Sequence, residues 1–345
     1  MKIALNLKPT ENPFGGGNSF LKLLIRNLEE SGVEFRFDLS ERDLDFILIL
    51  DPRWNHPLRQ FSLREIFNYS LRNPKTLIVH RINECDERKN TKNMNYKIQK
   101  ANYLADATVF VSSWLSQLDL SYMKSKAGIE IPTKIILNGS DEKLFKFDNS
   151  KDWDGREKIK IITHHWSSNA MKGLAVYQAL DDLLDDRNCS SLFSFTYLGN
   201  VPKGAKFKNT TVLPPLSGRA LAEELSKHHV YLTGSLNEPG GNHQNEGGLS
   251  GLPIIFLKSG SMSEYCDGYG VGLDSIQDLK GALGEVRDNY ASLRQKMINF
   301  PHTSSRMTSE YASLFDSLLS SIPAIIQRRN RFRDPRTLLR LQFPM

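Results

Sequence analysis

Short apolar runs alternate along the chain with longer segments in which apolar residues recur every three or four positions. In the first half, the runs have strand composition and read KIALNL, EFRFDL, FILIL, TLIVH, TVFVS and KIIL. Between the first two, residues 20–31 place Phe20, Leu23, Leu24 and Leu28 on one stripe of a helix. This alternation of strand and helix predicts an α/β fold, with a parallel sheet covered by helices.

The alternation pauses at residues 146–158, which are charged and have no apolar period, and then starts again. The later runs read IKIIT, FSFTYLG, TTVLP, HVYLTG and LPIIFL, and helical stretches lie at about 171–185, 217–227 and 244–251. A chain of 345 residues is long enough for two domains with a cleft between them. We therefore expect two doubly wound, Rossmann-like domains with ligand crevices at the carboxyl ends of their strands. The expected boundaries are 1–147 for the first domain, 148–158 for a linker, 159–322 for the second domain and 323–345 for a basic tail.

Composition excludes several classes of protein. Hydrophobic residues make up 39% and charged residues 24% of the chain, as in ordinary folded proteins. The N-terminal apolar run is too short for a signal peptide, and no stretch reaches the roughly 18 apolar residues of a membrane span, so we expect a cytoplasmic protein. Cys85, Cys189 and Cys266 are far apart and form no CxxC motif, which predicts reduced thiols and no zinc site. The net charge of +6 favours an anionic partner without choosing one.

A glycine run, Gly15–Gly17, stands between the first strand and the first helix. Glycines at such a junction let a phosphate or sugar approach the backbone. One interpretation is a dinucleotide fingerprint, because Gly15-x-Gly17 opens it and Asp38 lies where the ribose-binding acid belongs, but Phe20 occupies the third glycine position. The other interpretation is a tight turn followed by a capped helix.

The stretch EPGGNHQNEGGLSGLPII, at residues 238–255, places two acids across a glycine loop that leads into a buried strand. Gly240 and Gly241 allow close approach of a ligand, and the start of the following helix favours a diphosphate. An ionised Glu246 offers two oxygens to the neighbouring hydroxyls of a ribose. Glu238 and Glu246 would then share one ligand. Considered separately, each glutamate would be interpreted as a solvated surface acid.

This stretch resembles the E-x7-E signature of the retaining glycosyltransferases of family 4, which have the two-domain GT-B fold. Other segments resemble that family in the same order: GGGNSF, LIVHR, VFVSSWL, ILNGSDEKLF and MKGL. The resemblance extends to about residue 275. It implies a transferase that takes its sugar from a nucleotide-diphosphate donor and has a cleft between its two domains.

The resemblance also implies roles for individual residues. His80 and Glu238 would lie beside the sugar as catalytic residues, and Glu246 would bind the ribose of the donor. The diphosphate would be stabilised by one ammonium group and by backbone amides, at Lys172, Gly16, Gly17, Gly241 and Asn242. Preorganised donors of this kind stabilise the negative charge that develops on the leaving group.

The chain departs from the family at one phosphate-binding position. The family usually has an arginine five residues before the phosphate lysine, and here Ser167 stands at that place. His164, His165 or a basic residue of the other domain would have to supply the missing charge.

Two acid pairs have the spacing of a metal and diphosphate clamp, Asp152-x-Asp154 and Asp43-x-Asp45. The first lies in the expected linker and the second precedes a strand, so both are interpreted as solvated acids. We expect no metal site, and no cofactor apart from the donor substrate.

Three functions remain open from the sequence. The first is a retaining, metal-independent hexosyltransferase that acts on a glycan or lipid-linked acceptor in cell-surface polysaccharide assembly. The second is a sugar-nucleotide epimerase of the same architecture. The third is a nonenzymatic binder of nucleic acid or of an anionic membrane surface. The basic residues have no interleaved aromatic residues, which argues against nucleic acid as a partner.

The tail is strongly basic and also contains apolar residues. Its arginines are Arg328, Arg329, Arg331, Arg333, Arg336 and Arg340. Asp334 is the one acidic residue among them. One interpretation is a segment that packs back on the protein. The other is a short interfacial piece on the anionic inner face of a membrane, where each basic residue contributes about 1 kcal/mol. Pro335 would interrupt any long helix there.

Overall fold

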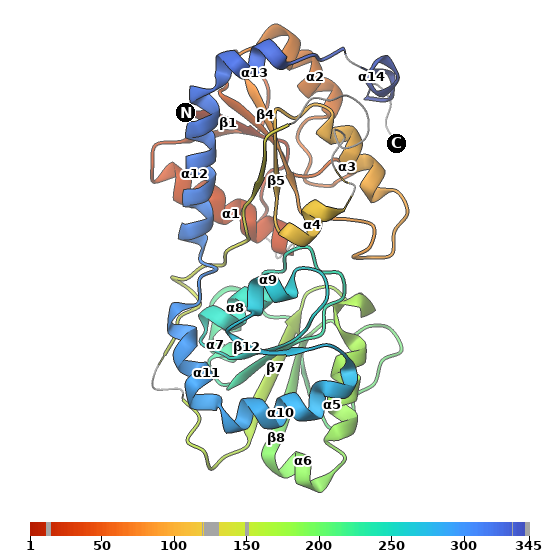
Figure 1. Cartoon of the computed structure of the whole chain (residues 1–345), viewed down its shortest axis with the longest axis vertical. Coiled ribbons are helices and arrows are strands. Elements are labelled where there is room, and N and C mark those ends of the chain that lie inside the picture. Colours follow the sequence, from red (N-terminus) through yellow and green to blue (C-terminus); the bar gives the residue numbers. More distant parts are fainter. Residues whose placement is uncertain (12–14, 119, 121–130, 149–151, 333, 342–345) are drawn as a thin grey trace. The chain divides into compact units, whose positions relative to one another are not determined.

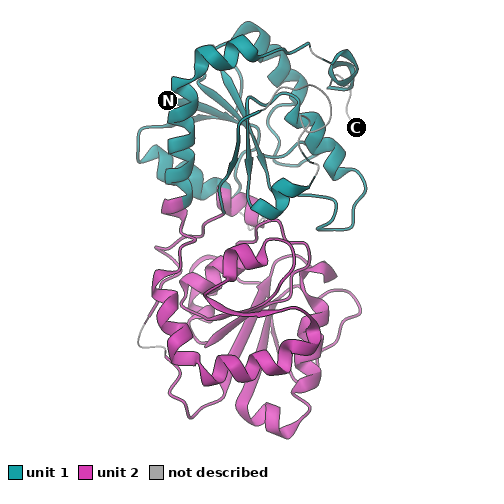
Figure 2. Cartoon of the chain, viewed as in Figure 1, with its two compact units in different colours: residues 1–12, 21–137, 307–345 teal, residues 13–20, 138–306 magenta. Residues whose placement is uncertain are grey.

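The computed structural model describes residues 1–11, 15–118, 120, 131–148, 152–332 and 334–341. The chain forms two compact units, which Figure 2 colours separately. Unit 1 comprises Met1–Asn12, Leu21–Leu137 and Met307–Met345, and unit 2 comprises Pro13–Phe20 and Asn138–Arg306. The chain therefore enters unit 1 three times.

Unit 1 is a six-stranded parallel sheet in the order β2-β1-β3-β4-β5-β6. Figure 1 labels β1, β4 and β5 of this sheet. The strands are β1 (Lys2–Leu5), β2 (Glu34–Arg36), β3 (Phe46–Ile49), β4 (Leu77–Ile82), β5 (Ala107–Phe110) and β6 (Thr133–Ile135). The helices are α1 (Gly16–Glu29), whose first turn is grouped with unit 2, α2 (Leu63–Arg72), α3 (Met94–Asn102), α4 (Ser113–Gln117), α12 (Ser304–Ser320), α13 (Ile322–Arg328) and α14 (Pro335–Leu341). The residues of β3, β4 and β5 are all buried, as expected for parallel strands covered on both faces.

Unit 2 is a second six-stranded parallel sheet, in the order β12-β11-β10-β7-β8-β9. The strands are β7 (Ile159–His165), β8 (Phe193–Gly199), β9 (Thr211–Leu213), β10 (Val230–Thr233), β11 (Ile254–Leu257) and β12 (Gly270–Leu273). The helices are α5 (Leu174–Leu183), α6 (Arg187–Leu192), α7 (Gly218–Leu225), α8 (His243–Leu249), α9 (Met262–Cys266), α10 (Leu279–Asp288) and α11 (Tyr290–Lys296). The strand order reverses between β7 and β10. A doubly wound sheet binds ligands at the carboxyl ends of such a pair.

The predicted α/β class and the parallel sheets are confirmed. The sequence interpretation did not name β12, whose residues are GVGL. A Cβ atom on Gly270 would lie 1.8 Å from the backbone oxygen of Ile254, so the approach of β11 leaves room only for glycine. Val271 and Leu273 alternate with the glycines and are buried. This edge strand therefore has two apolar side chains, which is fewer than the apolar runs from which the other strands were predicted.

The end of the chain differs from the expected boundaries. The second domain was expected to reach residue 322, whereas the structure groups the chain from Met307 onward with unit 1. The reason is apolar packing: Phe315 of α12 is fully buried, with its ring centroid 4.7 Å from that of Phe46 on β3. Ile325 and Leu341 are buried as well, so α13 and α14 also contribute to the structure of this unit.

Two arginines of the tail are structural. Arg329 donates from Nε to Asp106 Oδ1 at 2.9 Å and from Nη2 to Oδ2 at 2.9 Å, and Arg331 donates from Nη2 to both oxygens at 3.1 and 2.9 Å. All three side chains are at most 7% exposed. These arginines are therefore not available to a membrane or to solvent.

The outer side of the tail keeps both charged and apolar residues. Arg336 and Arg340 are exposed, and Phe332 and Leu339 are 60% and 63% exposed. Arg333 and Phe343 lie outside the described residues. No helix among the residues that the structure describes is both long and apolar enough to cross a membrane.

Candidate active site

Most of the predicted site residues lie in unit 2, around the carboxyl ends of β7 and β10. Glu238 lies in the loop after β10, and Glu246 lies in the next helix, α8. Lys172 ends a short 3-10 helix, Ala170–Lys172, that follows β7. The parallel sheet brings these three residues to one edge, although 66 residues separate Lys172 from Glu238.

Lys172 and Glu238 form a direct ion pair. Lys172 Nζ donates to Glu238 Oε2 at 2.5 Å, and the two side chains are 16% and 3% exposed. The backbone oxygen of Glu238 accepts hydrogen bonds from Ser261, from the backbone nitrogen at 2.9 Å and from Oγ at 2.8 Å. The loop is thus held by its backbone, and the carboxylate is held beside the ammonium group.

Gly241 has no room for a side chain. A Cβ atom there would lie 2.6 Å from Gln244 Oε1 and 2.7 Å from the ring of His243. The adjacent Gly240 is fixed through its carbonyl oxygen, which accepts from Asn138 Nδ2 at 2.7 Å. Asn245 Nδ2 in turn donates to the backbone oxygen of Asn138 at 2.9 Å. The loop between the two glutamates is therefore built for close packing against its surroundings.

Asn138 opens the NGSDEKLF segment, and sequence analysis gave it no role of its own. Its side chain is buried, and its backbone nitrogen donates to Tyr265 Oη at 2.8 Å. The residue thereby ties the chain after β6 to the loop that carries Glu238. The signal in the sequence was an asparagine directly before a glycine at a strand end, which is more often a turn.

The glycine run at the start of α1 lies beside the same loop. Residues 13–20 are grouped with unit 2, and the carbonyl oxygen of Gly16 accepts from Asn242 Nδ2 at 3.2 Å. Asn242 is the N-cap residue of α8, and its carbonyl oxygen accepts from the backbone nitrogen of Glu246 at 2.9 Å. Gly17 has open space where a Cβ atom would be. Gly16 and Asn242, which sequence analysis assigned to one diphosphate, are thus in contact.

Glu246 is paired with a histidine. His164 Nε2 and Glu246 Oε2 are 2.6 Å apart, and the two side chains are 9% and 15% exposed. His164 Nδ1 lies 3.1 Å from the hydroxyl of Tyr231, which is fully buried on β10. Burial raises the pKa of the Tyr231 hydroxyl well above its usual value, so this group keeps its proton.

The neighbouring His165 has different partners. Its Nε2 atom lies 3.2 Å from Thr163 Oγ1 and 2.5 Å from the hydroxyl of Tyr177, and all three residues are buried. Ser167, which stands where the family has an arginine, is exposed, and its hydroxyl accepts from the backbone nitrogen of Asn169 at 3.3 Å. Of the two histidines named as substitutes for that arginine, His164 is therefore the one that contacts an acid of the site.

His80 lies in unit 1, on β4. Its ring is buried, and Nδ1 is 3.3 Å from the side-chain nitrogen of Asn102. Burial lowers the pKa of His80 to about 3, so the ring is neutral at physiological pH. A neutral imidazole can donate one hydrogen bond and accept another, and it brings no positive charge to a ligand.

The two DxD pairs are engaged in other contacts. Asp152 Oδ1 accepts from Arg294 Nε at 2.7 Å, and Asp154 accepts from two backbone nitrogens of its own turn. Asp43 pairs with Lys2 Nζ at 2.7 Å, and Asp45 accepts from the backbone nitrogen of Lys2 at 2.8 Å. Over the described part of the chain, no cluster of three or more histidine, cysteine, aspartate or glutamate side chains could hold a metal ion.

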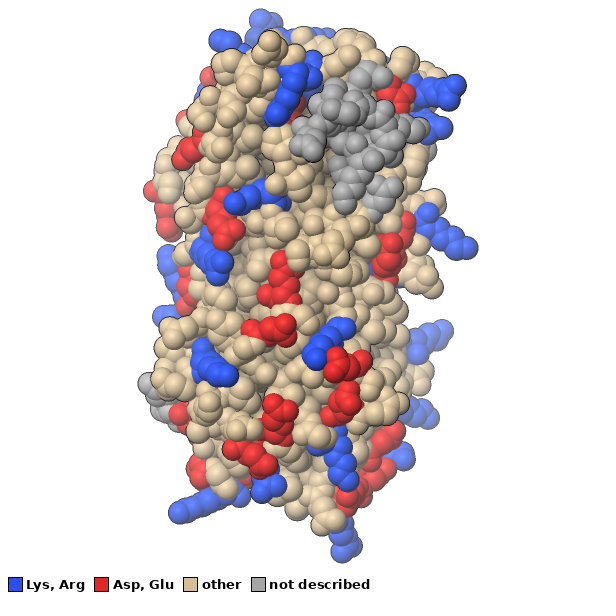
Figure 3. All heavy atoms as spheres, in the orientation of Figure 1, with Lys and Arg blue, Asp and Glu red and all other residues tan. Residues whose placement is uncertain are grey.

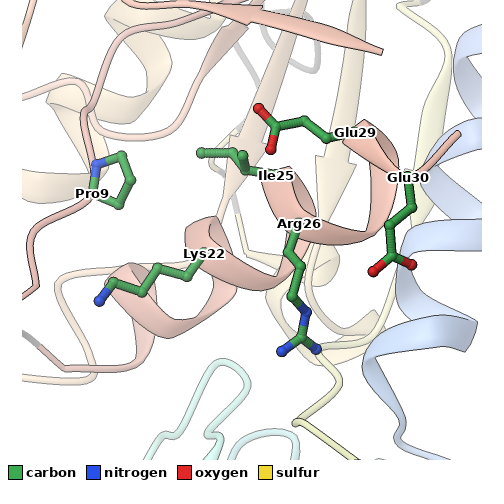
Figure 4. Close-up of a pocket in the computed structure, with 6 residues that line it drawn as sticks. All are labelled: Pro9, Lys22, Ile25, Arg26, Glu29 and Glu30. Carbon is green, nitrogen blue, oxygen red and sulfur yellow. The ribbon is translucent and has the colours of Figure 1, made fainter. Parts of the chain in front are cut away.

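A hollow elsewhere on the protein does not coincide with these residues. It lies along α1 in unit 1, where two acidic and two basic side chains line it with Pro9 and Ile25 (Figure 4). One of the basic residues, Lys22, pairs with the exposed Glu11 at 3.0 Å. We assign the hollow no role.

Comparison with known proteins gives structural matches only. Neither a family model nor a curated protein matches the sequence. The structure of Alr3699/HepE from Anabaena in complex with UDP and glucose has a TM-score of 0.66 at 15% identity, over 92% of this chain and 100% of that one. Sucrose-phosphate synthase from Thermosynechococcus elongatus has a TM-score of 0.64 at 13% identity, over 93% and 99% of the two chains. A glycosyltransferase from Rickettsia africae has a TM-score of 0.58 at 11% identity, over 92% and 98%.

The chain has the GT-B fold. The matches span both units and nearly the full length of the compared proteins, which confirms the predicted fold class. The GT-B fold thus accounts for the two parallel sheets and for the strand reversal at β7 and β10.

Proposed function

We propose that this protein is a glycosyltransferase that transfers a sugar from a nucleotide-diphosphate donor to a hydroxyl group. The observation that carries the proposal is the arrangement of the two glutamates. Both lie near the strand reversal of unit 2. The Glu238 carboxylate pairs with the ammonium group of Lys172, and the Glu246 carboxylate contacts the ring of His164. The complexes of Alr3699/HepE with UDP and with UDP-glucose support a donor of this class.

The donor would be bound by unit 2. Glu246 would accept hydrogen bonds from the ribose hydroxyls, and Glu238 would lie at the hydroxyls of the transferred sugar. Lys172 would exchange part of its interaction with Glu238 for the diphosphate, together with the amides near Gly241 and Asn242. An ammonium group in a largely buried site stabilises the leaving diphosphate more strongly than it would in water.

The reaction would retain the configuration at the anomeric carbon. The bond from that carbon to the diphosphate oxygen breaks, the bond to the acceptor oxygen forms on the same face, and the acceptor proton passes to the leaving diphosphate. No protein nucleophile and no metal ion take part in this scheme. His80, as a neutral ring, would contribute a hydrogen bond to the sugar.

The acceptor would be a glycan or a lipid-linked glycan, with a role in cell-surface polysaccharide assembly. The outer side of the tail favours a lipid surface, because exposed Phe332 and Leu339 lie among arginines that have no part in the Asp106 pairs. Nucleic acid is disfavoured, because basic and acidic side chains are interspersed over the face shown in Figure 3. An epimerase of the same fold is the second candidate, because it would bind the same donor.

A ligand screen followed by a turnover assay tests the proposal. Thermal unfolding is measured with UDP, GDP, ADP, CDP and dTDP, because a ligand at 100 times its Kd adds about 2.7 kcal/mol of stability. The best nucleotide is then offered as a panel of its sugar conjugates. A transferase releases the nucleoside diphosphate, whereas an epimerase changes the sugar and leaves the conjugate intact.

The matched variants are Glu246→Ala in the proposed site and Glu264→Ala, which removes a carboxylate from α9 of the same unit. Loss of nucleotide binding in the first variant alone supports the assignment. No stabilisation of the intact chain by any nucleotide would refute the proposed function.

A further inference from the structure

We propose that Tyr231 and His164 form a hydrogen-bonded relay that fixes the Glu246 carboxylate for recognition of the ribose diol. The inference rests on the proposed function, because it takes the donor to be a ribonucleotide. It assigns His164 and Tyr231 as positioning residues, since they act through Glu246 and do not touch the donor in this scheme.

The contacts fix one proton of the relay and allow the rest. His164 Nε2 lies 2.6 Å from the carboxylate oxygen Glu246 Oε2, and two acceptors at that distance would repel each other, so Nε2 carries a proton and donates to Glu246. The backbone nitrogen of His164 donates to the Tyr231 hydroxyl at 3.3 Å. In the relay that we propose, this hydroxyl donates its own proton to His164 Nδ1, at 3.1 Å. The chain of donors therefore runs from Tyr231 through His164 to Glu246.

The surroundings make this arrangement rigid. Tyr231 is fully buried, and the space for its ring exists because a Cβ atom on Gly247 would lie 2.5 Å from Tyr231 Cδ2. The rings of His164 and Tyr231 stand nearly perpendicular, with centroids 5.6 Å apart. A buried ring that is packed on its faces and contacted at both nitrogens holds its partner in one orientation, and this is how a supporting shell positions a binding group.

The other oxygen of the carboxylate is left for a ligand. Among the residues that the structure describes, none forms a hydrogen bond with Glu246 Oε1, although the side chain is only 15% exposed. With Oε2 held by one donor, the carboxylate keeps lone pairs on both oxygens for two adjacent hydroxyls. A carboxylate fixed in rotation discriminates a diol from a single hydroxyl better than a freely turning one, because both acceptors are already placed.

The experiment measures nucleotide affinity and the preference for ribose. Kd is determined by calorimetry for UDP, GDP, ADP and CDP and for their 2′-deoxy forms. The protein variants are His164→Ala, His164→Gln and Tyr231→Phe. The control is His228→Gln, a buried histidine at the amino end of β10 whose Nε2 atom lies 2.9 Å from Thr196 Oγ1. Each variant is checked for folding by thermal unfolding.

We expect His164→Ala to raise Kd for the preferred ribonucleotide by about 10- to 100-fold, the range for one hydrogen bond to a charged group. The same variant should lower the ratio of deoxyribonucleotide Kd to ribonucleotide Kd toward one. His164→Gln should recover part of both effects, because its amide can donate to Glu246. Tyr231→Phe should weaken binding by about 3- to 10-fold, the size of one neutral hydrogen bond. His228→Gln should leave Kd within about twofold.

The outcomes separate the inference from the proposed function. If the intact chain binds neither these nucleotides nor dTDP, the proposed function fails and the inference fails with it. If the intact chain binds and the variants of His164 and Tyr231 keep its Kd and its preference for ribose, the inference alone is overturned. A preference of the intact chain for a 2′-deoxy form also overturns it. Should His164→Ala not fold, His164→Gln and Tyr231→Phe still decide the question.

Discussion

Because Lys172 and Glu238 form a buried ion pair, we expect the effect of replacing one of them on stability to depend on whether the other is still charged. Replacing Lys172 by methionine keeps most of the side-chain volume and removes the positive charge. It leaves the Glu238 carboxylate 3% exposed, with its ammonium partner at 2.5 Å gone. Breaking a buried ion pair from one side typically costs about 3 to 5 kcal/mol, because the remaining charge is not solvated. We expect a loss of this size from Lys172→Met.

The double variant should recover most of that loss. Glu238→Gln removes the second charge, and a buried neutral pair in place of a buried ion pair is often nearly neutral in stability. The exposed pair of Lys258 and Asp274, whose side chains are 41% and 80% exposed, provides the control. Lys258→Met should cost far less than Lys172→Met, because exposed ion pairs are solvated and contribute little to stability.

The assay has to report on unit 2 alone, because a chain with two units need not unfold in one step. Trp54 and Trp114 lie in unit 1 and are replaced by phenylalanine, so that fluorescence comes from the two tryptophans of unit 2. Urea unfolding then gives a free energy for each variant in this background. The reasoning is refuted if Lys172→Met costs no more than Lys258→Met, or if the double variant is as unstable as Lys172→Met.

Three further expectations concern metal, pH and lipid. Transfer should continue in the presence of EDTA with an anomerically retained product, and activity that returns only with Mg²⁺ or Mn²⁺ would contradict the proposed chemistry. Burial lowers the pKa of His229 and of His302 to about 4, against about 6.5 when unfolded, so these rings stay neutral in the native state while the unfolded chain binds protons. Between pH 6.5 and pH 4, each of these two histidines should therefore lower the free energy of unfolding by about 1.4 kcal/mol for every unit by which the pH falls. In the variant His302→Gln, the midpoint of urea unfolding should depend less steeply on pH. Arg336→Gln with Arg340→Gln should weaken sedimentation with anionic vesicles at low salt but not with neutral ones, and equal binding by variant and wild type would remove the lipid role. A deletion of the tail is a poorer test, because it also removes the buried pairs with Asp106.

The fold could be predicted from the sequence because buried parallel strands appear as continuous apolar runs. The strands β3 and β4 are of this kind, and all their residues are buried. β12 was not visible, since the glycines at positions 270 and 272 make room for β11 and for Lys258, which follows it, and weaken the apolar signal. The boundary at residue 307 was not visible either. An amphipathic helix such as α12 shows in sequence that it packs on something, but it does not show on which sheet.

The acids of the candidate site could be selected from the sequence, whereas their partners could not. Glu238 and Glu246 stand out because acids among glycines are unusual before a buried strand. Their pairing with Lys172 and His164 joins residues 66 and 82 positions apart, and only the adjacency of β7 and β10 brings them together. Tyr231 looked like an ordinary strand residue. Its hydroxyl acquires a role only because the helix after β10 presents glycine at position 247.

The threefold entry of the chain into unit 1 also bears on how the protein is made. A ribosome completes residues 138–306 of unit 2 before it has synthesised Met307–Met345. Until those last residues emerge, the nascent first unit lacks Phe315 against Phe46, and the Asp106 carboxylate lacks both of its arginines. Unit 1 therefore reaches its final packing only after the whole of unit 2 has been synthesised, and a stop codon before position 307 would remove the apolar cover of Phe46 and both counter-ions of Asp106.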